Sequence, residues 1–389
     1  MTPKNLYETF NKVYGKSAER TFFAPGRINL IGEHIDYNGG LVFPCAISQG
    51  TYALVSKRTD RNVNFYSMNF EELGIIESNL DNIEYLTEDD WANYPKGVLK
   101  YVQEDYTLDH GFDVLYFGNI PNGAGLSSSA SIDVVTTVMV NNMFSLDIPQ
   151  IDIVHNTRRV ENEFMGVNTG IMDQYAITFG RKDSALLLDT QKAEHRLVPI
   201  KLKDMSIVIM NTNKVRGLTD SKYNQRLEEC QRALKILQEF YDIQDLCELN
   251  QGQLEVKREA FLEDQIAYNR AFHAITENER VKQAVKVLEA GDIKAFGDLM
   301  YLSHESLKTD YEVTGVELDT LVDAAKKSEY CLGARVTGAG FGGCAIAIVE
   351  DKGLDAFIES VGLEYKEIIG YDASFYQAHV GDGAHEIIS

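Results

Sequence analysis

The sequence lacks most of the features that mark secreted, membrane-bound or zinc-clustered proteins. Its five cysteines are odd in number and widely scattered, and none forms a CxxC pair, which argues against a disulfide framework and a structural zinc site. No segment reaches the roughly 18 uncharged apolar residues that a membrane-spanning helix needs, and the N-terminal segment lacks the apolar run of a signal peptide. We therefore expect a cytoplasmic protein without membrane association.

Proline and basic residues are also scarce. Seven prolines and the lack of low-complexity stretches leave little room for long disordered linkers. Lys and Arg total 37 against 59 Asp and Glu, which gives a formal net charge of −22. Such a charge repels polyanions, so nucleic acid is excluded as a partner. A small anion such as ATP can bind only where a metal ion, a helix dipole or backbone amides reverse the sign locally.

The length and the pattern of elements predict two α+β domains. A chain of 389 residues is too long for one ordinary core. Runs rich in β-branched and aromatic residues favour strands at 41–47, 51–58, 62–68, 112–120, 184–190, 205–211, 333–340, 344–349 and 375–380. Helical patterns occupy 131–145, 151–180 with a break at Gly166, 219–241 behind a Thr219 or Asp220 N-cap, 316–329 and 352–361. We place the boundary in the polar segment at 195–205, which gives domains 1–200 and 201–389.

A glycine- and serine-rich loop, PNGAGLSSSAS at 121–131, lies between a predicted strand and a predicted helix. Gly123 and Gly125 permit positive φ, and the serines from 127 to 129 can cap the helix, whose first amides would face a bound phosphate. A purely structural serine cap remains an open alternative. The loop lacks the lysine of a Walker motif, so ordinary P-loop ATPases are excluded.

A second glycine-rich segment, GAGFGG at 338–343, matches the dinucleotide pattern GxGxxG. The residues that follow, CAIAIVED, favour a short strand where that motif requires a long helix. NAD binding is therefore not predicted. We interpret the segment as a tight strand-turn-strand element that either supports the site or lines it.

The segment GRINLIGEHIDY at 26–37 concentrates charged and polar side chains between glycines. Carboxylates such as Glu33 and Asp36 accept hydrogen bonds well from the hydroxyls of a neutral polyol. Two alternatives remain open, a surface ion pair of Arg27 with Glu33 and a packed, hydrogen-bonded imidazole at His34. A metal pair of His34 with Asp36 is disfavoured.

A third candidate group is Asp173, in the segment ENEFMGVNTGIMDQ at 161–174. Gly166 suits the C′ position of one helix, and Asn168 or Thr169 suits the N-cap of the next. Asp173 then falls in a first turn, where the helix dipole favours its ionised form. The position suits a catalytic base, although a first-turn aspartate is also a common stabilising residue.

Together the three motifs resemble those of the GHMP small-molecule kinases, in order and in approximate spacing. The first, GRxNLIGEHxDY, is the version found in galactokinases, and GIMDQ, DSKYNQRLEEC and FYQAHVGDGA extend the resemblance over nearly the whole chain. The resemblance implies an N-terminal domain like ribosomal protein S5 domain 2 and a C-terminal ferredoxin-like GHMP domain. The active site would lie between these domains.

The resemblance also implies roles for individual residues. Asp173 would be the base and Arg27 would stabilise the transition state. The sugar would contact Glu33, His34, Ile35, Asp36 and Tyr223. ATP would contact Ser67, Gly123, Ala124, Gly125, Leu126, Ser127, Ser128 and Ser129. Mg²⁺ would bind Ser129 and Glu161.

Small departures from the family pattern surround the metal residues. Asp133 replaces the usual glutamate after SSSAS, and Asn162 replaces a frequent histidine. Glu163 is a rival ligand, but helical spacing turns it by about 200° from Glu161, so both cannot face one ion.

The resemblance implies transfer of a phosphoryl group from ATP, with Mg²⁺, to the C1 hydroxyl of D-galactose, and we expect a monomer. Two rival functions are another GHMP kinase, such as an N-acetylgalactosamine kinase, and a non-catalytic sensor of galactose and ATP. Trp91 and Tyr94 are candidates for stacking on adenine.

Overall fold

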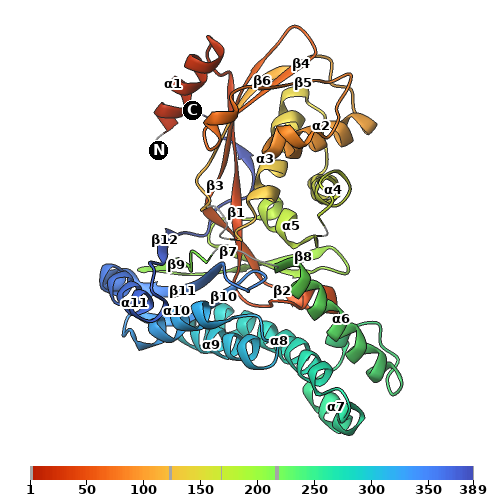
Figure 1. Cartoon of the computed structure of the whole chain (residues 1–389), viewed down its shortest axis with the longest axis vertical. Coiled ribbons are helices and arrows are strands. Elements are labelled where there is room, and N and C mark those ends of the chain that lie inside the picture. The colour runs from red at the N-terminus through yellow and green to blue at the C-terminus, as the bar shows by residue number, and fades with distance from the viewer. Residues whose placement is uncertain (1–2, 122–124, 168, 215–218, 389) are drawn as a thin grey trace.

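The computed structural model describes residues 3–121, 125–167, 169–214 and 219–388 (Figure 1). Its strands form three sheets within these ranges, and helices cover each of the two larger sheets. The long strands β1 and β3 run from the end of the molecule that carries α1 to its middle, where the smaller sheets begin. The predicted α+β class is confirmed.

The largest sheet has the order β13-β1-β3-β6-β4-β5 and is antiparallel except where β4 runs parallel to β6. Its strands are β1 (Arg20–Asn29), β3 (Pro44–Lys57), β4 (Asn62–Ser67), β5 (Ile76–Asn79), β6 (Phe112–Gly118) and β13 (His385–Glu386). One face is covered by α2 (Asn93–Asp105), α3 (Ser128–Phe144), α4 (Gln150–Arg159) and α5 (Met172–Phe179). Apolar side chains of α1 (Pro3–Tyr14) pack against β3 and β6 in a separate small cluster.

The second sheet has the order β10-β11-β9-β12, and all its pairs are antiparallel. Its strands are β9 (Met205–Asn211), β10 (Cys331–Thr337), β11 (Cys344–Glu350) and β12 (Ser374–Ala378). Helices lie between β9 and β10, and α11 (Leu354–Ile369) lies between β11 and β12. This β-α-β-β-α-β order with its 4-1-3-2 arrangement is the ferredoxin-like topology that the family resemblance implies.

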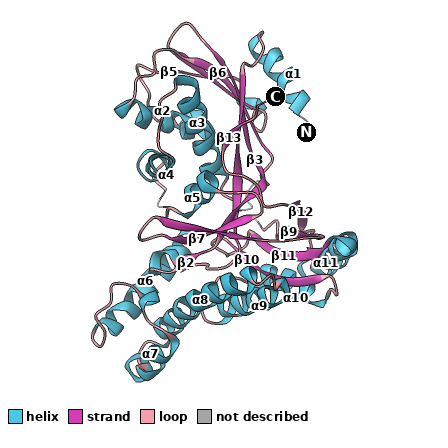
Figure 2. Ribbon diagram, turned by 180° about the vertical axis from the view of Figure 1, so that it is seen from behind, coloured by secondary structure: helices cyan, strands magenta, loops and turns pink. Residues whose placement is uncertain are grey.

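The helices of the second half form one layer, in which α9 and α10 pack on this sheet, α8 packs on α9, and α6 and α7 pack on α8 (Figure 2). They are α6 (Thr219–Gln238), α7 (Gln251–Val256), α8 (Gln265–Glu289), α9 (Ile293–Thr309) and α10 (Val316–Lys327). Helix α9 packs closely on β10, where Gly297 and Gly333 meet backbone to backbone, so a Cβ at Gly297 would lie 1.9 Å from the Leu332 carbonyl oxygen. The second sheet is thereby fixed against its helical layer.

A third, small sheet joins the two larger ones. Its order is β2-β7-β8, with β2 (Leu41–Val42), β7 (Ser184–Asp189) and β8 (Glu194–Pro199). Short helical turns occupy η1 (Asp36–Asn38), η2 (Glu71–Leu73), η3 (Thr87–Ala92), η4 (Val160–Phe164), η5 (Leu246–Glu248), η6 (Arg258–Phe261) and η7 (Asp351–Gly353). The largest hydrophobic cluster contains residues of β1, β7, β9 and the helices α8 to α11. Apolar residues of the segment that follows β1, such as Ile31 and Ile35, belong to the same continuous core.

Most strands and helices lie where the sequence predicts them, and the differences are local. Strand β8 occupies the polar segment in which we expected a domain boundary, and that boundary stays a prediction. The residue before α5 is Ile171, without a side-chain cap, so the N-cap expected at Thr169 is wrong, and Asn168 lies outside the described residues. Gly166 has φ of +72°, as a C′ residue should. No helix within the described ranges is long and apolar enough to cross a membrane.

Candidate active site

An arginine–aspartate pair stands at the centre of the candidate site. Arg27 on β1 meets Asp173 in the first turn of α5, with Nε 3.0 Å from Oδ1 and Nη2 3.1 Å from Oδ2. The third guanidinium nitrogen, Nη1, donates to the Gly125 carbonyl at 2.8 Å. Arg27 is buried, whereas the side chain of Asp173 is 32% exposed. The pair is thus held from the protein side and is open on the other.

The glycine loop reaches this pair through its last residues. Ser127 has φ of +62°, and its hydroxyl donates to Asp173 Oδ2 at 2.5 Å instead of capping α3, so the predicted capping role of Ser127 is wrong. Gly26 lies where the register of β1 shifts, and a Cβ there would meet the Leu126 carbonyl at 2.7 Å. The Leu126 side chain is buried in the core, so any contact of this residue with a ligand would come from its backbone. Gly123 and Ala124 lie outside the described residues.

Glu33 of the first motif is buried and fully engaged by protein groups. Asn29 Nδ2 donates to Glu33 Oε2, and the Gly338 amide donates to Oε1. Arg335 Nη1 lies 3.8 Å from Oε1. Burial raises the pKa of Glu33 to about 6, although Arg335 and Asn29 act in the opposite direction. The alternative of a surface ion pair between Arg27 and Glu33 is therefore wrong.

His34 is also held on both sides. Its Nδ1 lies 2.7 Å from the Tyr37 hydroxyl, and its Nε2 lies 3.1 Å from the Ala339 carbonyl. Because the carbonyl can only accept, Nε2 carries the proton and Nδ1 accepts from Tyr37. Burial lowers the pKa of His34 to about 4, so the ring is neutral. The packed imidazole is confirmed, and it leaves no ring nitrogen for a metal. A contact of His34 with sugar stays a prediction.

The GAGFGG segment connects β10 to β11, and Thr337 pairs with Cys344 across its ends. This confirms the tight strand-turn-strand element. Its Gly338 amide and Ala339 carbonyl are the groups that hold Glu33 and His34. The second half of the chain therefore fixes the first motif through backbone atoms.

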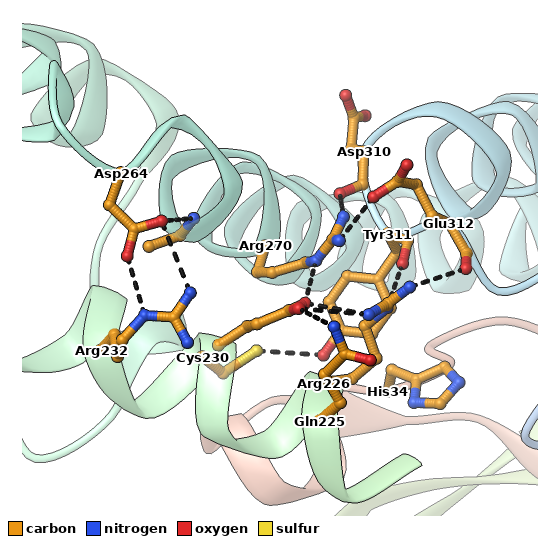
Figure 3. A network of polar contacts seen from close by, with 12 residues as sticks. His34, Gln225, Arg226, Cys230, Arg232, Asp264, Arg270, Asp310, Tyr311 and Glu312 are labelled. Carbon is orange, nitrogen blue, oxygen red and sulfur yellow. Dashed lines mark hydrogen bonds and ion pairs between the residues drawn. The ribbon is translucent and has the colours of Figure 1, made fainter. Parts of the chain in front are cut away.

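A buried polar network supports the aromatic residues next to His34 (Figure 3). The Tyr311 hydroxyl contacts the Tyr37 hydroxyl at 2.8 Å and Cys230 Sγ at 3.0 Å. Arg226 Nη1 lies 3.0 Å from Glu229 Oε2. Arg270 Nε lies 2.6 Å from that same oxygen.

Both arginines of this network also bind the backbone beside Tyr311. Arg226 donates from Nε to the Tyr311 carbonyl at 2.7 Å and from Nη2 to the Glu312 carbonyl at 3.0 Å, and Arg270 Nη1 donates to the Asp310 carbonyl at 2.5 Å. The network thus fixes α6, which carries Tyr223, against the Asp310–Glu312 loop.

Asp36 and Tyr223 lie close enough to Asp173 for its charge to act on both. Burial and the neighbouring Asp173 raise the pKa of Asp36 to about 6, while its own amide and that of Tyr37 lower it. Burial, Asp36 and Asp173 raise the pKa of Tyr223 well above its usual value. These mutual influences indicate that Asp36, Asp173 and Tyr223 are near neighbours.

Ile35 differs from its neighbours in the motif, because its side chain is completely buried. A Cβ on Gly40 would lie 2.7 Å from Ile35 Cβ, so the two residues are in tight contact. Any contact of Ile35 with sugar would therefore come from its main chain.

A cavity of about 250 Å³ opens beside the start of α3. Ser67 and Ser128 line it, together with Trp91 and Tyr94, the two aromatic residues that the sequence suggests for adenine. Trp91 stacks on Phe70 with ring centroids 6.4 Å apart and planes at 13°. A cavity with aromatic side chains next to a helix N-terminus suits a nucleotide, whose base can stack while its phosphates face backbone amides.

The predicted metal residues come together next to this cavity. Ser129 lies beside the Glu161 carboxylate, whose pKa burial raises and the Ser129 hydroxyl lowers. Glu161 is 4% exposed, and its Oε1 has no hydrogen-bond partner among the described groups. Oxygen donors with an unfilled buried acceptor suit a magnesium ion.

The rival carboxylate, Glu163, lies on the outside of the same segment. Its side chain is 57% exposed and pairs with Arg159 at 2.8 Å. The segment is a π-helix and not the α-helix that we assumed, yet the two glutamates still point apart. Glu163 is therefore poorly placed for the ion.

Comparison with known proteins agrees with this geometry. Residues 8–57 match the galactokinase galactose-binding signature, residues 93–181 the GHMP kinases N terminal domain, and residues 284–366 the GHMP kinases C terminal model. Galactokinase of Fusobacterium nucleatum is 54% identical over 99% of both chains, and that of Enterococcus faecalis is 51% identical over 98% of this chain and 99% of its own. The chain belongs to the galactokinase family.

Solved structures support the same conclusion. The crystal structure of Lactococcus lactis galactokinase complexed with galactose is similar with a TM-score of 0.93 and 47% identity over 99% of both chains. Methanococcus jannaschii mevalonate kinase shares the fold, with a TM-score of 0.66 at 21% identity over 93% of this chain and 98% of its own. The two-domain GHMP kinase fold that the motifs implied is confirmed.

Several residues that shape the site of this galactokinase-family chain were not predicted. They are buried charges and one amide: Asn29, Arg226, Glu229, Arg270 and Arg335. The sequence carries a signal for Arg335, which stands between Ala334 and Val336 in an otherwise apolar strand pattern. A charge at a core position of a strand needs a buried partner, and here that partner includes Glu33.

Proposed function

We propose that this chain transfers the γ-phosphoryl group of Mg·ATP to the C1 hydroxyl of D-galactose, giving galactose 1-phosphate and ADP. The observation that carries the proposal is the Arg27–Asp173 pair, because it joins the galactose-binding motif, the glycine loop and α5 at one open carboxylate. The carboxylate faces Asp36 and Tyr223, and the nucleotide cavity opens beside the adjacent loop.

Asp173 is the base in this proposal. The sugar C1 hydroxyl gives its proton to an Asp173 oxygen as its own oxygen bonds to the γ-phosphorus, and the bond from that phosphorus to the β–γ bridging oxygen breaks. Arg27 holds the Asp173 carboxylate in place through two hydrogen bonds. We expect late proton transfer, with positioning contributing more than bond-making.

Arg27 and the loop amides carry the electrostatic part of the reaction. The guanidinium lies between Asp173 and the Gly125 carbonyl, close to the loop that would hold the phosphates. A fixed positive group there offsets the charge that spreads over the phosphoryl oxygens in the transition state. Ser127, which donates to Asp173 Oδ2, orients the carboxylate toward the open side.

Ser129 and Glu161 would hold the magnesium ion, which when bound neutralises phosphate charge and orients the γ-phosphoryl group. Sugar recognition would use Asp36 and Tyr223 directly, and Glu33 and His34, which are already hydrogen-bonded within the protein, would complete the sugar pocket. We also propose that the enzyme is cytosolic and monomeric. Light scattering of the purified protein tests the oligomeric state.

The test of the function is sugar-dependent release of ADP by purified protein across galactose, glucose, N-acetylgalactosamine and mevalonate. We expect turnover with galactose and a phosphorus NMR signal from a sugar 1-phosphate. Preferred turnover of N-acetylgalactosamine would reassign the substrate. Binding of galactose and ATP without any ADP release would identify a sensor and contradict the proposal.

A further inference from the structure

Helix α3 carries a carboxylate that the folded chain does not satisfy. Asp133 is completely buried, and neither of its oxygens has a hydrogen-bond partner among the described groups. An unpaired buried polar group destabilises the fold, and a charged one does so more strongly. Native structures rarely contain such a group without a ligand, a water or a function to account for it.

Asp133 lies in the immediate surroundings of the proposed metal residues. It follows Ser129 by four positions on α3, so the two side chains share one face of the helix. Burial and the neighbouring Glu161 raise the pKa of Asp133 well above its ordinary value. Asp133 therefore faces the same small region as Ser129 and Glu161.

A third unsatisfied side chain comes from α5. Gln174 is completely buried, and no hydrogen bond of good geometry reaches its amide nitrogen or oxygen from a described group. It lies next to Glu161, because its amide lowers the pKa of that carboxyl. Unpaired polar atoms from α3, η4 and α5 thus converge beside the carboxylate of Glu161.

The region also lacks a positive countercharge. None of the ion pairs between described residues involves Asp133 or Glu161, and Arg27 and Lys96 are paired elsewhere, with Asp173 and with Asp89 respectively. Two buried carboxylates without a cation are costly, and a divalent ion would supply the missing charge.

We infer that Asp133 and Gln174 are positioning residues for the metal, forming a layer behind Ser129 and Glu161 that binds the ion's water molecules. This inference rests on the proposed function, which places the ion at Ser129 and Glu161. A magnesium ion keeps several waters when it binds carboxylates and phosphates, and those waters need acceptors. The Asp133 carboxylate and the Gln174 carbonyl are acceptors, while the Gln174 amide nitrogen can orient Glu161.

The experiment is Mn²⁺ binding, followed by the EPR signal of free Mn²⁺ in the presence of a non-hydrolysable ATP analogue. We expect Asp133→Asn to raise the Mn²⁺ dissociation constant about tenfold or more, the usual effect of groups that support metal ligands. Glu163→Gln removes the same charge from the exposed side of η4 and should leave Mn²⁺ affinity unchanged. Asp133→Glu keeps the carboxylate and should recover much of the affinity.

A second readout separates this role from a structural one. Without metal, Asp133→Asn should melt at a higher temperature than wild type, because an unpaired buried carboxylate has been removed. Galactose affinity measured by calorimetry should not change. If Asp133→Asn fails to fold, Gln174→Met serves as the test variant. It keeps the side-chain volume, removes both polar atoms and should weaken Mn²⁺ binding.

The outcomes distinguish this inference from the proposed metal site. Wild-type Mn²⁺ affinity in Ser129→Ala and Glu161→Gln would show that the ion is not held there, and both proposals about the metal would fail. A second outcome would overturn only the role of Asp133 and Gln174. In that outcome Ser129→Ala and Glu161→Gln bind Mn²⁺ weakly, but Asp133→Asn binds it with wild-type affinity. If Asp133→Asn does not fold, Gln174→Met takes its place in this comparison.

Discussion

The proposed sugar side and the proposed metal side of the site are built in opposite ways. Around the first motif, Glu33 and His34 have protein partners for their polar atoms, and a buried ion-pair network fixes the aromatic residues behind them. Around Glu161, buried oxygens and amide atoms of three side chains have none. The polar atoms of Glu33 and His34 find their partners within the protein, whereas the buried carboxylates and amide around Glu161 lack such partners among the described groups.

This difference indicates how each ligand is recognised. A preorganised sugar pocket loses little free energy to reorganisation on binding and rejects hydroxyls that do not match its fixed acceptors. A region with unpaired carboxylates is unstable by itself and gains stability when a cation binds. Sugar variants should therefore change selectivity, and metal variants should change cation affinity.

Asp173→Asn should have the largest effect on catalysis. We expect kcat to fall by a factor of about 10² to 10⁴, the usual size of a general-base contribution, while galactose affinity stays within about tenfold. Stopped-flow ADP release and calorimetry measure the two quantities. Near-normal turnover in a folded Asp173→Asn protein would remove this residue as the base.

Glu229→Gln tests whether the sugar side depends on its buried network. Glu229 is 3% exposed and receives hydrogen bonds from both Arg226 and Arg270, so its loss leaves two arginines short of a partner. We expect unfolding free energy to fall by about 3 to 5 kcal/mol in urea denaturation.

Glu312→Gln is the matched control for this variant. Glu312 pairs with the same Arg270 at 2.6 Å, but its side chain is 60% exposed. Its loss should cost less than about 1 kcal/mol. Equal losses in the two variants would contradict the assigned importance of the buried network.

Asp36→Ala should remove about a hundredfold discrimination between galactose and glucose. The two sugars differ in the orientation of the C4 hydroxyl, and a misplaced hydroxyl leaves a buried acceptor unpaired at a cost on the order of 1 to 3 kcal/mol. Galactose should lose kcat/KM while glucose loses little. Wild-type kcat/KM for galactose with wild-type rejection of glucose, in a variant that still binds ATP, would exclude Asp36 from sugar binding.

The smallest predicted effect is a pH dependence of galactose binding. The pKa of Asp36 is raised to about 6, so its ionised fraction grows about tenfold between pH 5 and pH 7. Affinity should rise about tenfold over this range, because the ionised carboxylate is the better acceptor. Glu33, with a pKa of about 6, contributes in the same direction, and His34, at about 4, stays neutral.

The same shifts predict how the free protein responds to pH. Both carboxyl pKa values are raised above their ordinary values, so the contribution of these groups to stability is largest below about pH 4 and declines as pH rises through 6.

Calorimetric titration between pH 5 and pH 7 measures galactose affinity, and Asp36→Asn should flatten most of the slope of that affinity against pH. An unchanged slope in Asp36→Asn would assign the effect to another group.

The sequence predicted the parts of this molecule that follow local rules. The strand run at 205–211 has high β propensity, the segment 131–145 was correctly predicted as a helix behind the serine-rich loop, and the motifs placed Asp173 in the first turn of a helix. Strand β8 was missed because Val198 is its only buried residue, so it lacks an alternating pattern. It forms a strand through its pairing with β7, which only the tertiary structure supplies.

The partners of the candidate site residues were harder to predict. Local reasoning allowed a pair of Arg27 with Glu33, six positions apart, but Arg27 pairs with Asp173, 146 positions away. Asp133 seemed only a departure from a family pattern, and its isolation became visible when α3, η4 and α5 packed together. Which buried charges meet depends on chain topology, and spacing within a motif carries little information about it.

Strand β13 sets a limit on when this molecule can finish folding. Its Glu386 carboxylate binds the Arg20 guanidinium, 366 positions away, at 2.7 and 2.6 Å, and the Ile387 amide donates to the Thr21 carbonyl at 2.8 Å. During synthesis, β1 must therefore wait with one edge unpaired until these late residues leave the ribosome. Such an edge is a site for unwanted strand pairing, so the nascent chain is most exposed to aggregation just before translation reaches β13.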